Sequence, residues 1–348
     1  MAEGPDITPI LNLLEDARDA GRCAEAAAAL RALSQLRPEN LQVKAALARA
    51  LFGAGLWQEA WDAYEVRFDL MPEVFTKVTR PGPNGPEAMP IWRGGALPES
   101  LLVMGEQGLG DTIQFARFLP MLRARGVRVH AVLDPRVMKL LAPVLEGIDA
   151  RPGGEAGRIH GVKAWLPLLN LPRALGLRPQ YYQGRIPYLA AEPERVARWR
   201  QRIGDQGFRI GIVWQGNPKA PVDRNRSVPL AVFAPIAALR GARLFALQKG
   251  PGEDTEAPFA LDRLGPEMDN GPDWFLDTAA AIMALDLVKA RYPDVSVTVV
   301  GNPGRTRIAF AHDRFALPKS AAERRDLYQS ASIALFDNVK GPTRDTLE

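Results

Sequence analysis

Hydrophobic positions along the chain follow two different spacings. Through the first seventy residues, apolar side chains recur every three or four positions, which predicts amphipathic helices. Four such helices are expected, at 10–20, 24–36, 41–54 and 58–70. Beyond residue 100, short apolar runs alternate with helical segments, which is typical of a parallel sheet covered by helices. The runs predict strands at 101–104, 127–133 and 164–166, and helices at 112–125 and 135–145.

A second series of the same kind follows a predicted helix at 192–206. Its apolar runs predict strands at 210–214, 244–248, 295–300 and 333–336. The fold class predicted from the pattern is therefore α/β, with an N-terminal helical block and two Rossmann-like halves in tandem, each built on a parallel sheet.

The helical block contains an internal repeat with an offset of 34 residues, which is the tetratricopeptide period. The matching pairs are Ala20/Ala54, Gly21/Gly55, Glu25/Glu59, Ala26/Ala60, Leu36/Leu70, Pro38/Pro72 and Glu39/Glu73. The alternative is a pair of plain helical hairpins with coincidental alanines. Since such units bury their apolar faces only by stacking, the block is expected to lean on the region that follows and to offer a surface for a protein partner.

The segment 80–93, RPGPNGPEAMPIWR, holds four prolines and two glycines, a composition that disfavours a helix or a central strand. It predicts a domain boundary. The expected organisation is tetratricopeptide-like repeats at 1–78, a linker at 79–94, a first Rossmann-like half at 95–190 and a second half at 191–348.

Composition and charge exclude several classes of protein. The net charge is only +4, and no block of like charges suggests a nucleic-acid-binding tail. The single Cys23 cannot form an internal disulfide, and no Cys/His cluster has zinc spacing. The first residues lack the basic start of a signal peptide, and no apolar run reaches the ~18 residues of a membrane span. A cytoplasmic protein without a transmembrane segment is predicted.

A glycine-rich loop follows the first predicted strand and opens a helix. It contains Gly105, Gln107, Gly108, Gly110, Asp111 and Thr112. Glycines allow a tight turn and a close approach of the backbone to a ligand, and a helix N-terminus presents free N–H groups. The spacing matches neither the dinucleotide fingerprint nor a Walker loop. Asp111 is expected at the N-cap, either only as a cap or also as a general base.

The second half carries polar loops at the ends of its predicted strands. Lys219, Arg224 and Arg226 follow the strand at 210–214, and Gln248 and Lys249 end the strand at 244–248. Basic side chains at the carboxyl end of parallel strands suit a diphosphate, for which arginine offers a bidentate fork. The alternative is a solvated basic loop.

A further segment begins another helix, with Asp277 or Thr278 expected as its cap. An ordinary cap before an alanine-rich core helix is the alternative to a binding role. The three histidines lie far apart in sequence with no partner at helical spacing, which favours packing or surface roles.

Several ordered motifs carry a resemblance to a known family. The runs WRGG, LLVMGEQGLGDTIQFARFLPML, WLPLLNLP, GIVWQGNP, RSVPL, LFALQKG and DTAAAIMALDLV lie in this order between residues 92 and 288. They resemble bacterial tetratricopeptide proteins with a C-terminal GT-B glycosyltransferase region, related to lipopolysaccharide heptosyltransferases and more loosely to protein O-GlcNAc transferases.

The resemblance implies transfer of a sugar from a UDP- or ADP-linked donor to a protein or glycan acceptor, with no metal and no other cofactor. It implies Asp111 as the base, and Arg226 with Lys249 as stabilisers of the leaving diphosphate; Asn217 is similar to a donor-loop residue. After Val288 the sequence departs from the family pattern, which predicts an incomplete donor half. The alternative function is a non-catalytic scaffold for protein partners.

Overall fold

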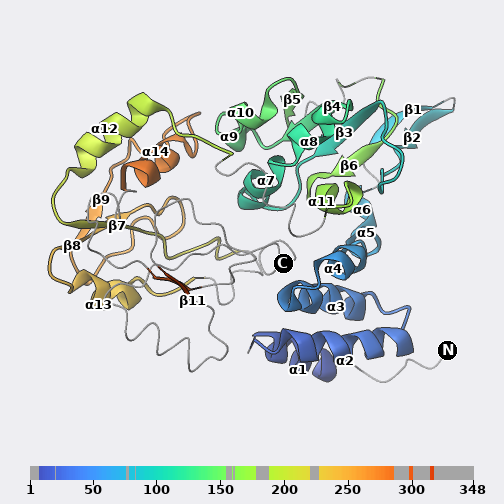
Figure 1. Ribbon diagram of the computed structural model, residues 1–348, viewed down its shortest axis with the longest axis horizontal. Helices are drawn as coiled ribbons and strands as arrows, with labels where there is room; N and C mark the ends of the chain where they lie inside the picture. Colours follow the sequence, from blue (N-terminus) through green and yellow to red (C-terminus); the bar gives the residue numbers. More distant parts are fainter. Residues whose placement is uncertain are drawn as a thin grey trace. The chain divides into compact units, whose positions relative to one another are not determined.

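The structure of the protein is a computed structural model, and its fold is mixed α/β with parallel sheets (Figure 1). It describes residues 8–19, 21–75, 78–82, 84–153, 159, 161–177, 188–219 and 227–285, with strands at 298–300 and 314–316. The chain divides into two compact units. The first is mainly Met1–Pro135 with Val144–Gly184, and the second is Arg136–Pro143 with Arg185–Val339.

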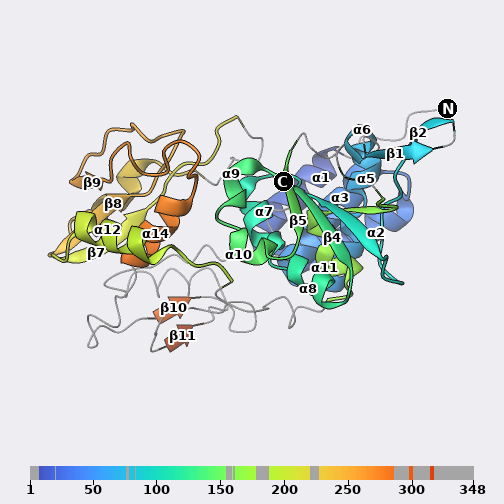
Figure 2. The same cartoon turned by 90° about the horizontal axis from the view of Figure 1, so that it is seen from above.

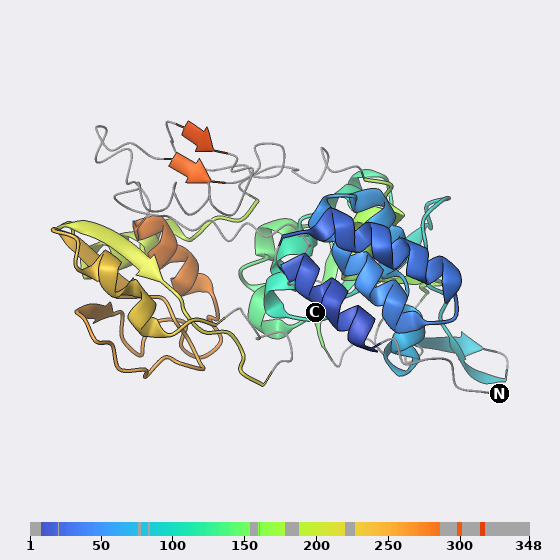
Figure 3. The ribbon, with the colours of Figure 1, turned by 90° about the horizontal axis from the view of Figure 1, so that it is seen from below.

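The first unit begins with the helical block, in which α1 packs on α2, α2 on α3 and α3 on α4 (Figure 3). Asn40 caps α3 by accepting the N–H of Val43 at 3.0 Å, and Gly55 ends α3 in the left-handed conformation, with φ 78°. The helices are α1 (Thr8–Asp19), α2 (Cys23–Leu36), α3 (Leu41–Ala54), α4 (Trp57–Tyr64), α5 (Arg67–Leu70) and α6 (Pro72–Phe75).

Helices occur at the four predicted places, but the prediction of one continuous helix at 58–70 was wrong. The N–H groups of Glu65 and Val66 bond to carbonyls three residues back, which tightens the turn and separates α4 from α5. The buried centre of the block is aromatic: the ring of Phe52 meets that of Trp61 edge-on, with centroids 4.8 Å apart. Membership of the tetratricopeptide class stays a prediction.

The proline-rich segment after the block forms a two-stranded antiparallel hairpin, β1 (Thr79–Gly82) and β2 (Gly85–Ala88) (Figure 2). Both strands are edges, so prolines are tolerated in them. The chain then returns to the parallel sheet, where the N–H of Trp92 donates to the carbonyl of Trp165 at 2.8 Å. The hairpin and the sheet thus belong to the same compact unit.

The first sheet is wholly parallel, in the order β5-β4-β3-β6. Its strands are β3 (Ser100–Met104), β4 (Arg128–Leu133), β5 (Asp149–Pro152) and β6 (Trp165–Pro167). The chain moves from β3 outward to β5 and then crosses back to β6 on the other side of β3. Ligands of open α/β sheets bind at such a reversal, outside the carboxyl ends of the strands.

Prolines break both helices predicted in this region. The predicted helix 112–125 is two helices, because Pro120 has no N–H and is accepted only in the first turn of a new helix. Pro143 similarly interrupts the predicted helix 135–145. The helices that connect these strands are α7 (Leu109–Ala116), α8 (Leu119–Ala124), α9 (Pro135–Met138) and α10 (Ala142–Leu145), with the 3-10 helix η2 (Leu168–Asn170) and α11 (Leu171–Ala174) after β6.

The second unit contains a parallel sheet in the order β7-β8-β9. Its elements are α12 (Pro193–Ile203), β7 (Phe208–Ile212), η5 (Leu230–Phe233), α13 (Ala234–Ala237), β8 (Ala242–Ala246), β9 (Leu261–Arg263) and α14 (Leu276–Leu285). Helices α12 and α14 pack together around Trp199, Ile203 and the buried alanines of α14. Strands β7 and β8 end two residues earlier than predicted, so Trp214 and Gln248 lie in the loops that follow them.

The remaining described strands, β10 (Thr298–Val300) and β11 (Arg314–Ala316), form a separate parallel pair. Strand β10 occupies the end of the range predicted at 295–300. The strand predicted at 333–336 lies outside the described residues.

Candidate functional site

The glycine-rich loop lies at the carboxyl end of β3, at the reversal of the first sheet. The N–H of Gly105 donates to the carbonyl of Val132 at 2.8 Å, so the loop leaves β3 alongside β4. Gln107 has φ 61°, a left-handed conformation that is uncommon for a residue other than glycine. Gly108 is the N-cap of α7, and a Cβ at Gly110 would meet nothing within 4 Å. The first turn of α7 is therefore open at Gly110.

Asp111 is the third residue of α7 and not its N-cap, which corrects the prediction. Its half-buried carboxylate accepts the N–H of Gly108 at 2.9 Å, which is one half of a capping box, because Gly108 has no side chain to accept a bond in return. Thr112 is buried, and its hydroxyl donates to the carbonyl of Gly108 at 3.3 Å. The capping contribution of Asp111 is thus established in the structure, whereas its role as a base stays a prediction.

Glu106 is the residue of this loop that the sequence did not single out. Its Oε1 accepts Nη2 of Arg67 at 2.9 Å and the N–H of Leu169 at 3.2 Å, and Nε of Arg67 donates to its Oε2 at 3.4 Å. Arg67 also donates to Oδ1 of Asn170. Since Leu169 and Asn170 follow β6, Arg67 of α5 joins the segments that leave β3 and β6.

The guanidinium of Arg67 is almost completely buried, at 4% exposed. It lies 4.2 Å from the ring centroid of Tyr64 and 4.6 Å from that of Phe68, and Nη1 donates to the carbonyl of Tyr64 at 3.4 Å. Gln107 donates to the hydroxyl of Tyr64. Burial raises the pKa of Tyr64 well above its ordinary value, which keeps the phenol protonated. In the sequence, the local sign of this role is a charged residue, Arg67, between the aromatic residues Tyr64 and Phe68.

At the carboxyl edge of the second sheet, Gln248 is buried and fully bonded. Its Oε1 accepts the N–H groups of Trp214 at 3.1 Å and Gln215 at 3.0 Å. Its Nε2 donates to the carbonyls of Gln215 at 2.9 Å and Pro251 at 2.8 Å. Gln248 therefore holds together the loops that follow β7 and β8.

Other residues predicted on the donor side also make hydrogen bonds within the protein. Lys249 donates to Glu253 at 2.6 Å, and this hydrogen bond, opposed by burial, lowers the pKa of Glu253. The exposed Asn217 accepts the N–H of the exposed Lys219 at 3.1 Å. Arg224 and Arg226 lie outside the described residues.

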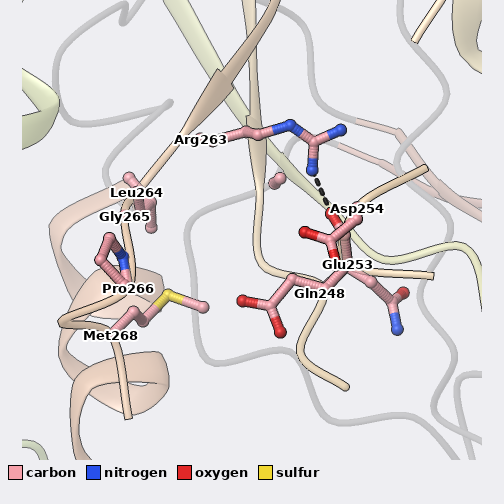
Figure 4. Close-up of a pocket in the computed structure, with 9 residues that line it drawn as sticks. Gln248, Glu253, Asp254, Arg263, Leu264, Gly265, Pro266 and Met268 are labelled. Carbon is pink, nitrogen blue, oxygen red and sulfur yellow. Dashed lines mark hydrogen bonds between the residues drawn. The ribbon is translucent and has the colours of Figure 1, made fainter. Parts of the chain in front are cut away.

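A pocket of ≈ 240 Å³ adjoins Gln248 at the carboxyl ends of β8 and β9 (Figure 4). Figure 4 shows Leu264, Pro266 and Met268 on one side and Gln248 with two carboxylate residues on the other. It is lined by Ala246, Gln248, Glu253, Asp254, Arg263, Leu264, Gly265, Pro266 and Met268. The volume is just below the roughly 300–1,000 Å³ usual for small-molecule sites.

Asp277 is a buried carboxylate between α12 and α14. It accepts Nε1 of Trp199 at 2.8 Å and Nη1 of Arg195 at 3.0 Å, and it pairs with Arg198. Burial acts to raise the pKa of Asp277, but hydrogen bonds from Trp199 and Arg195 outweigh it, so the pKa lies below its ordinary value.

The expected cap of α14 is also corrected. Asp269 accepts the N–H groups of Asp277 at 2.8 Å and Thr278 at 3.1 Å, so the cap comes from a residue eight positions upstream. The hydroxyl of Thr278 is 2.5 Å from Asp269. Both predicted residues therefore serve the packing of α14, and their part in donor binding stays a prediction.

These features define a mixed α/β protein with loops gathered at the carboxyl edges of two parallel sheets. No family model matches the chain. It is 28% identical over 297 residues to protein FlbA of Caulobacter vibrioides; the match covers 77% of this chain but only 48% of FlbA. The chain thus spans about half the length of that curated relative.

Among solved structures, the chain aligns with the iron-containing dodecameric glycosyltransferase TibC of enterotoxigenic E. coli H10407. The sequence identity is 13%, the alignment covers 68% of this chain and 65% of TibC, and the TM-score is 0.36. A TM-score at this level carries no argument about the fold or the function. Within the described ranges, no helix has both the length and the apolar character needed to cross a membrane.

Proposed function

We propose that this chain is a GT-B glycosyltransferase that moves a sugar from a UDP- or ADP-linked donor to a protein or glycan acceptor. In this proposal the first sheet presents the acceptor and the second sheet binds the donor. The tetratricopeptide-like helices offer a protein-binding surface, and the enzyme works in the cytoplasm without a metal.

The observation that carries the proposal is the glycine-rich loop. It follows β3 at the point where the order of the first sheet reverses, and Asp111 lies in the first turn of the helix that it opens. The same residues carry the sequence resemblance to heptosyltransferase-like proteins. The pocket beside Gln248 lies at the corresponding edge of the second sheet.

The proposed step is a substitution at the anomeric carbon. Asp111 takes the proton of the acceptor hydroxyl, the acceptor oxygen bonds to the anomeric carbon, and the bond to the nucleoside diphosphate breaks. Arg226 and Lys249 balance the charge on the departing diphosphate, with Asn217, Lys219, Arg224, Gln248, Asp277 and Thr278 as further donor-side residues. Lys249 exchanges its contact with Glu253 for the diphosphate.

Isothermal titration with UDP- and ADP-linked sugars tests donor binding. Heat of binding is expected with at least one donor, and no heat with any of them at millimolar concentration contradicts the proposal. With a binding donor, Asp111→Asn should abolish transfer and leave donor affinity unchanged. Asp16→Asn, on the exposed side of α1, is the matched control and should keep full transfer.

A second candidate is a non-catalytic scaffold. The observation that favours it is the engagement of the proposed donor residues in internal contacts, with Gln248 fully bonded and Lys249 paired with Glu253. This candidate predicts no donor binding together with normal folding of Lys249→Ala. The titration therefore separates the two functions.

A further inference from the structure

The helical block contacts the glycine-rich loop through side chains at successive turns. Arg67 binds the carboxylate of Glu106, the hydroxyl of Tyr64 accepts from Gln107, and the ring of Trp61 meets that of Phe115 in α7, with centroids 5.8 Å apart. We propose that Arg67 and Tyr64 are positioning residues that hold the loop Gly105–Gly108 in its binding conformation. The site at the carboxyl edge of the first sheet is then incomplete without the helical block.

The loop has little of its own to hold this shape. Glycines at 105 and 108 leave the backbone many alternatives, and ordering them is entropically costly. Gln107 adopts the left-handed conformation, which is disfavoured for a residue with a Cβ. Strain of this kind persists only where the surroundings impose it. The two residues between these glycines are held by the helical block: Glu106 by Arg67 of α5 and Gln107 by Tyr64 of α4.

Arg67 suits this role because of its geometry. Its Nη2 reaches Glu106 after β3 and Asn170 after β6, while Nε reaches the second oxygen of Glu106. A planar fork with five donors can make these contacts together, whereas an ammonium group is a compact point charge on a flexible stem. Near-complete burial of Arg67 makes its loss costly for Glu106, which would be left without its counter-charge.

The inference rests on the proposed function only for the nature of the ligand. The position of the loop can be measured without any substrate, by hydrogen exchange of the amides at 105–112. A failure of glycosyl transfer therefore leaves this inference standing, and an unchanged loop overturns it whatever the enzyme does.

Hydrogen exchange should be compared among Arg67→Met, Glu106→Gln and the matched control Arg173→Met in the full chain. Arg173 also ties the block to the sheet, through Asp62 at 2.9 Å and Glu65 at 3.3 Å, but none of its hydrogen bonds reaches the loop. Amides at 105–112 should exchange at least about tenfold faster in the first two variants, the factor expected for one lost charge-assisted hydrogen bond. Equal acceleration in Arg173→Met would mean general loosening and would overturn the proposal.

Two milder variants keep the test decisive if Arg67→Met does not fold. Tyr64→Phe keeps the ring and removes the hydroxyl that accepts from Gln107, so loop exchange should accelerate while β4 amides stay protected. Arg67→Lys keeps the charge without the fork, and its loop should exchange as fast as in Glu106→Gln. Wild-type exchange in Arg67→Lys, or an unchanged loop in Tyr64→Phe, contradicts the positioning role.

For an active preparation, a split of kinetic constants adds a readout that general destabilisation does not give. Tyr64→Phe should raise the KM for the acceptor and leave donor affinity unchanged. Equal changes for both substrates would contradict the assignment of Tyr64 to this loop.

Discussion

The carboxyl edges of the two sheets are held by different means. At the first sheet, the loop after β3 is fixed from outside the sheet, by Arg67, which lies 39 residues before Glu106 and 103 before Asn170. At the second sheet, Gln248 joins the loops of the adjacent strands β7 and β8, and Lys249 pairs with Glu253 four residues away. The first edge therefore depends on the helical block, whereas the second is organised by its own strands.

The two edges also differ in the charge of the groups that hold them. Arg67 and Glu106 are a largely buried ion pair, in which the loss of one partner leaves an uncompensated charge. Gln248 makes neutral hydrogen bonds, whose loss costs only the unpaired amide groups. Changes at the first edge should therefore be larger and should spread to the helical block.

The largest effect is expected for Arg67→Met. Removal of the guanidinium should lower the free energy of unfolding of the first unit by about 3–5 kcal/mol, because Glu106 stays buried and charged. Native-state hydrogen exchange of the amides in β3 and β4 measures this, with β7 and β8 as the internal reference. Arg173→Met breaks an exposed pair with Asp62 and a contact with Glu65, which keeps Arg93 as its counter-charge, so it should cost no more than about 1 kcal/mol. Equal losses in both variants would remove the distinction between buried and exposed pairs.

Asp277 offers the corresponding test in the second unit, where a buried carboxylate joins α12 to α14. Asp277→Asn should lower the free energy of unfolding by about 2–3 kcal/mol at neutral pH, because hydrogen bonds from arginine lose their charged acceptor. Denaturant unfolding of wild type and Asp277→Asn measures this loss, and hydrogen exchange of the amides in α12 serves as a local probe. A neutral result would show that the apolar contacts between the two helices hold them together without the charge of Asp277.

The difference in stability between wild type and Asp277→Asn should depend on pH. Since the folded-state pKa of Asp277 is lowered, the unfolded chain binds the proton first as the pH falls. The stabilisation by Asp277 is complete above its ordinary pKa near 3.9 and is lost as the pH falls through the lower folded value. The difference in the free energy of unfolding between wild type and Asp277→Asn should be constant between about pH 5 and pH 7 and shrink at lower pH. A difference that grows on acidification would contradict the direction of the pKa shift.

A smaller effect is expected at the second edge for Gln248→Ala. Loss of the amide leaves the N–H groups of Trp214 and Gln215 unpaired, which should cost about 1–2 kcal/mol. Exchange of the amides at 213–216 should accelerate, and that at 105–112 should not. Gln201→Ala, at an exposed position of α12, is the control. Faster exchange at both 105–112 and 213–216 would contradict the conclusion that the two edges are held independently.

The smallest effect is expected for Asp111→Ala, which removes the acceptor for the N–H of Gly108. Loss of this helix-terminal contact should cost about 1 kcal/mol, measured as a lower midpoint of unfolding. Asp16→Ala should be neutral within about 0.5 kcal/mol, since it lies on an exposed surface. A cost above that of Gln248→Ala would contradict a contribution limited to the capping contact with Gly108.

The pattern of apolar residues predicted the inner strands β3, β4 and β8 and the edge strands β6 and β7, but it missed the edge strands β5 and β9. Strands β3 and β4, with sequences SLLVM and RVHAVL, are mostly apolar, whereas β5 and β9, with sequences DARP and LDR, have no apolar run. The predicted helices failed where Pro120 and Pro143 required a new first turn. At the candidate site, the glycines and Asp111 could be found from their order along the chain, but Glu106 could not.

The sequence by itself determined the alternation of elements, the place of the glycine-rich loop after β3 and the polar residues after β7 and β8, because these depend on local periodicity and on glycine and proline. Tertiary structure decided which polar groups meet. Arg67 with Glu106, Gln248 with Trp214, and Asp269 as the cap of α14 are contacts between residues eight or more positions apart. Burial makes each of these contacts necessary, since a charge or an amide removed from water must find its partner wherever the fold places one.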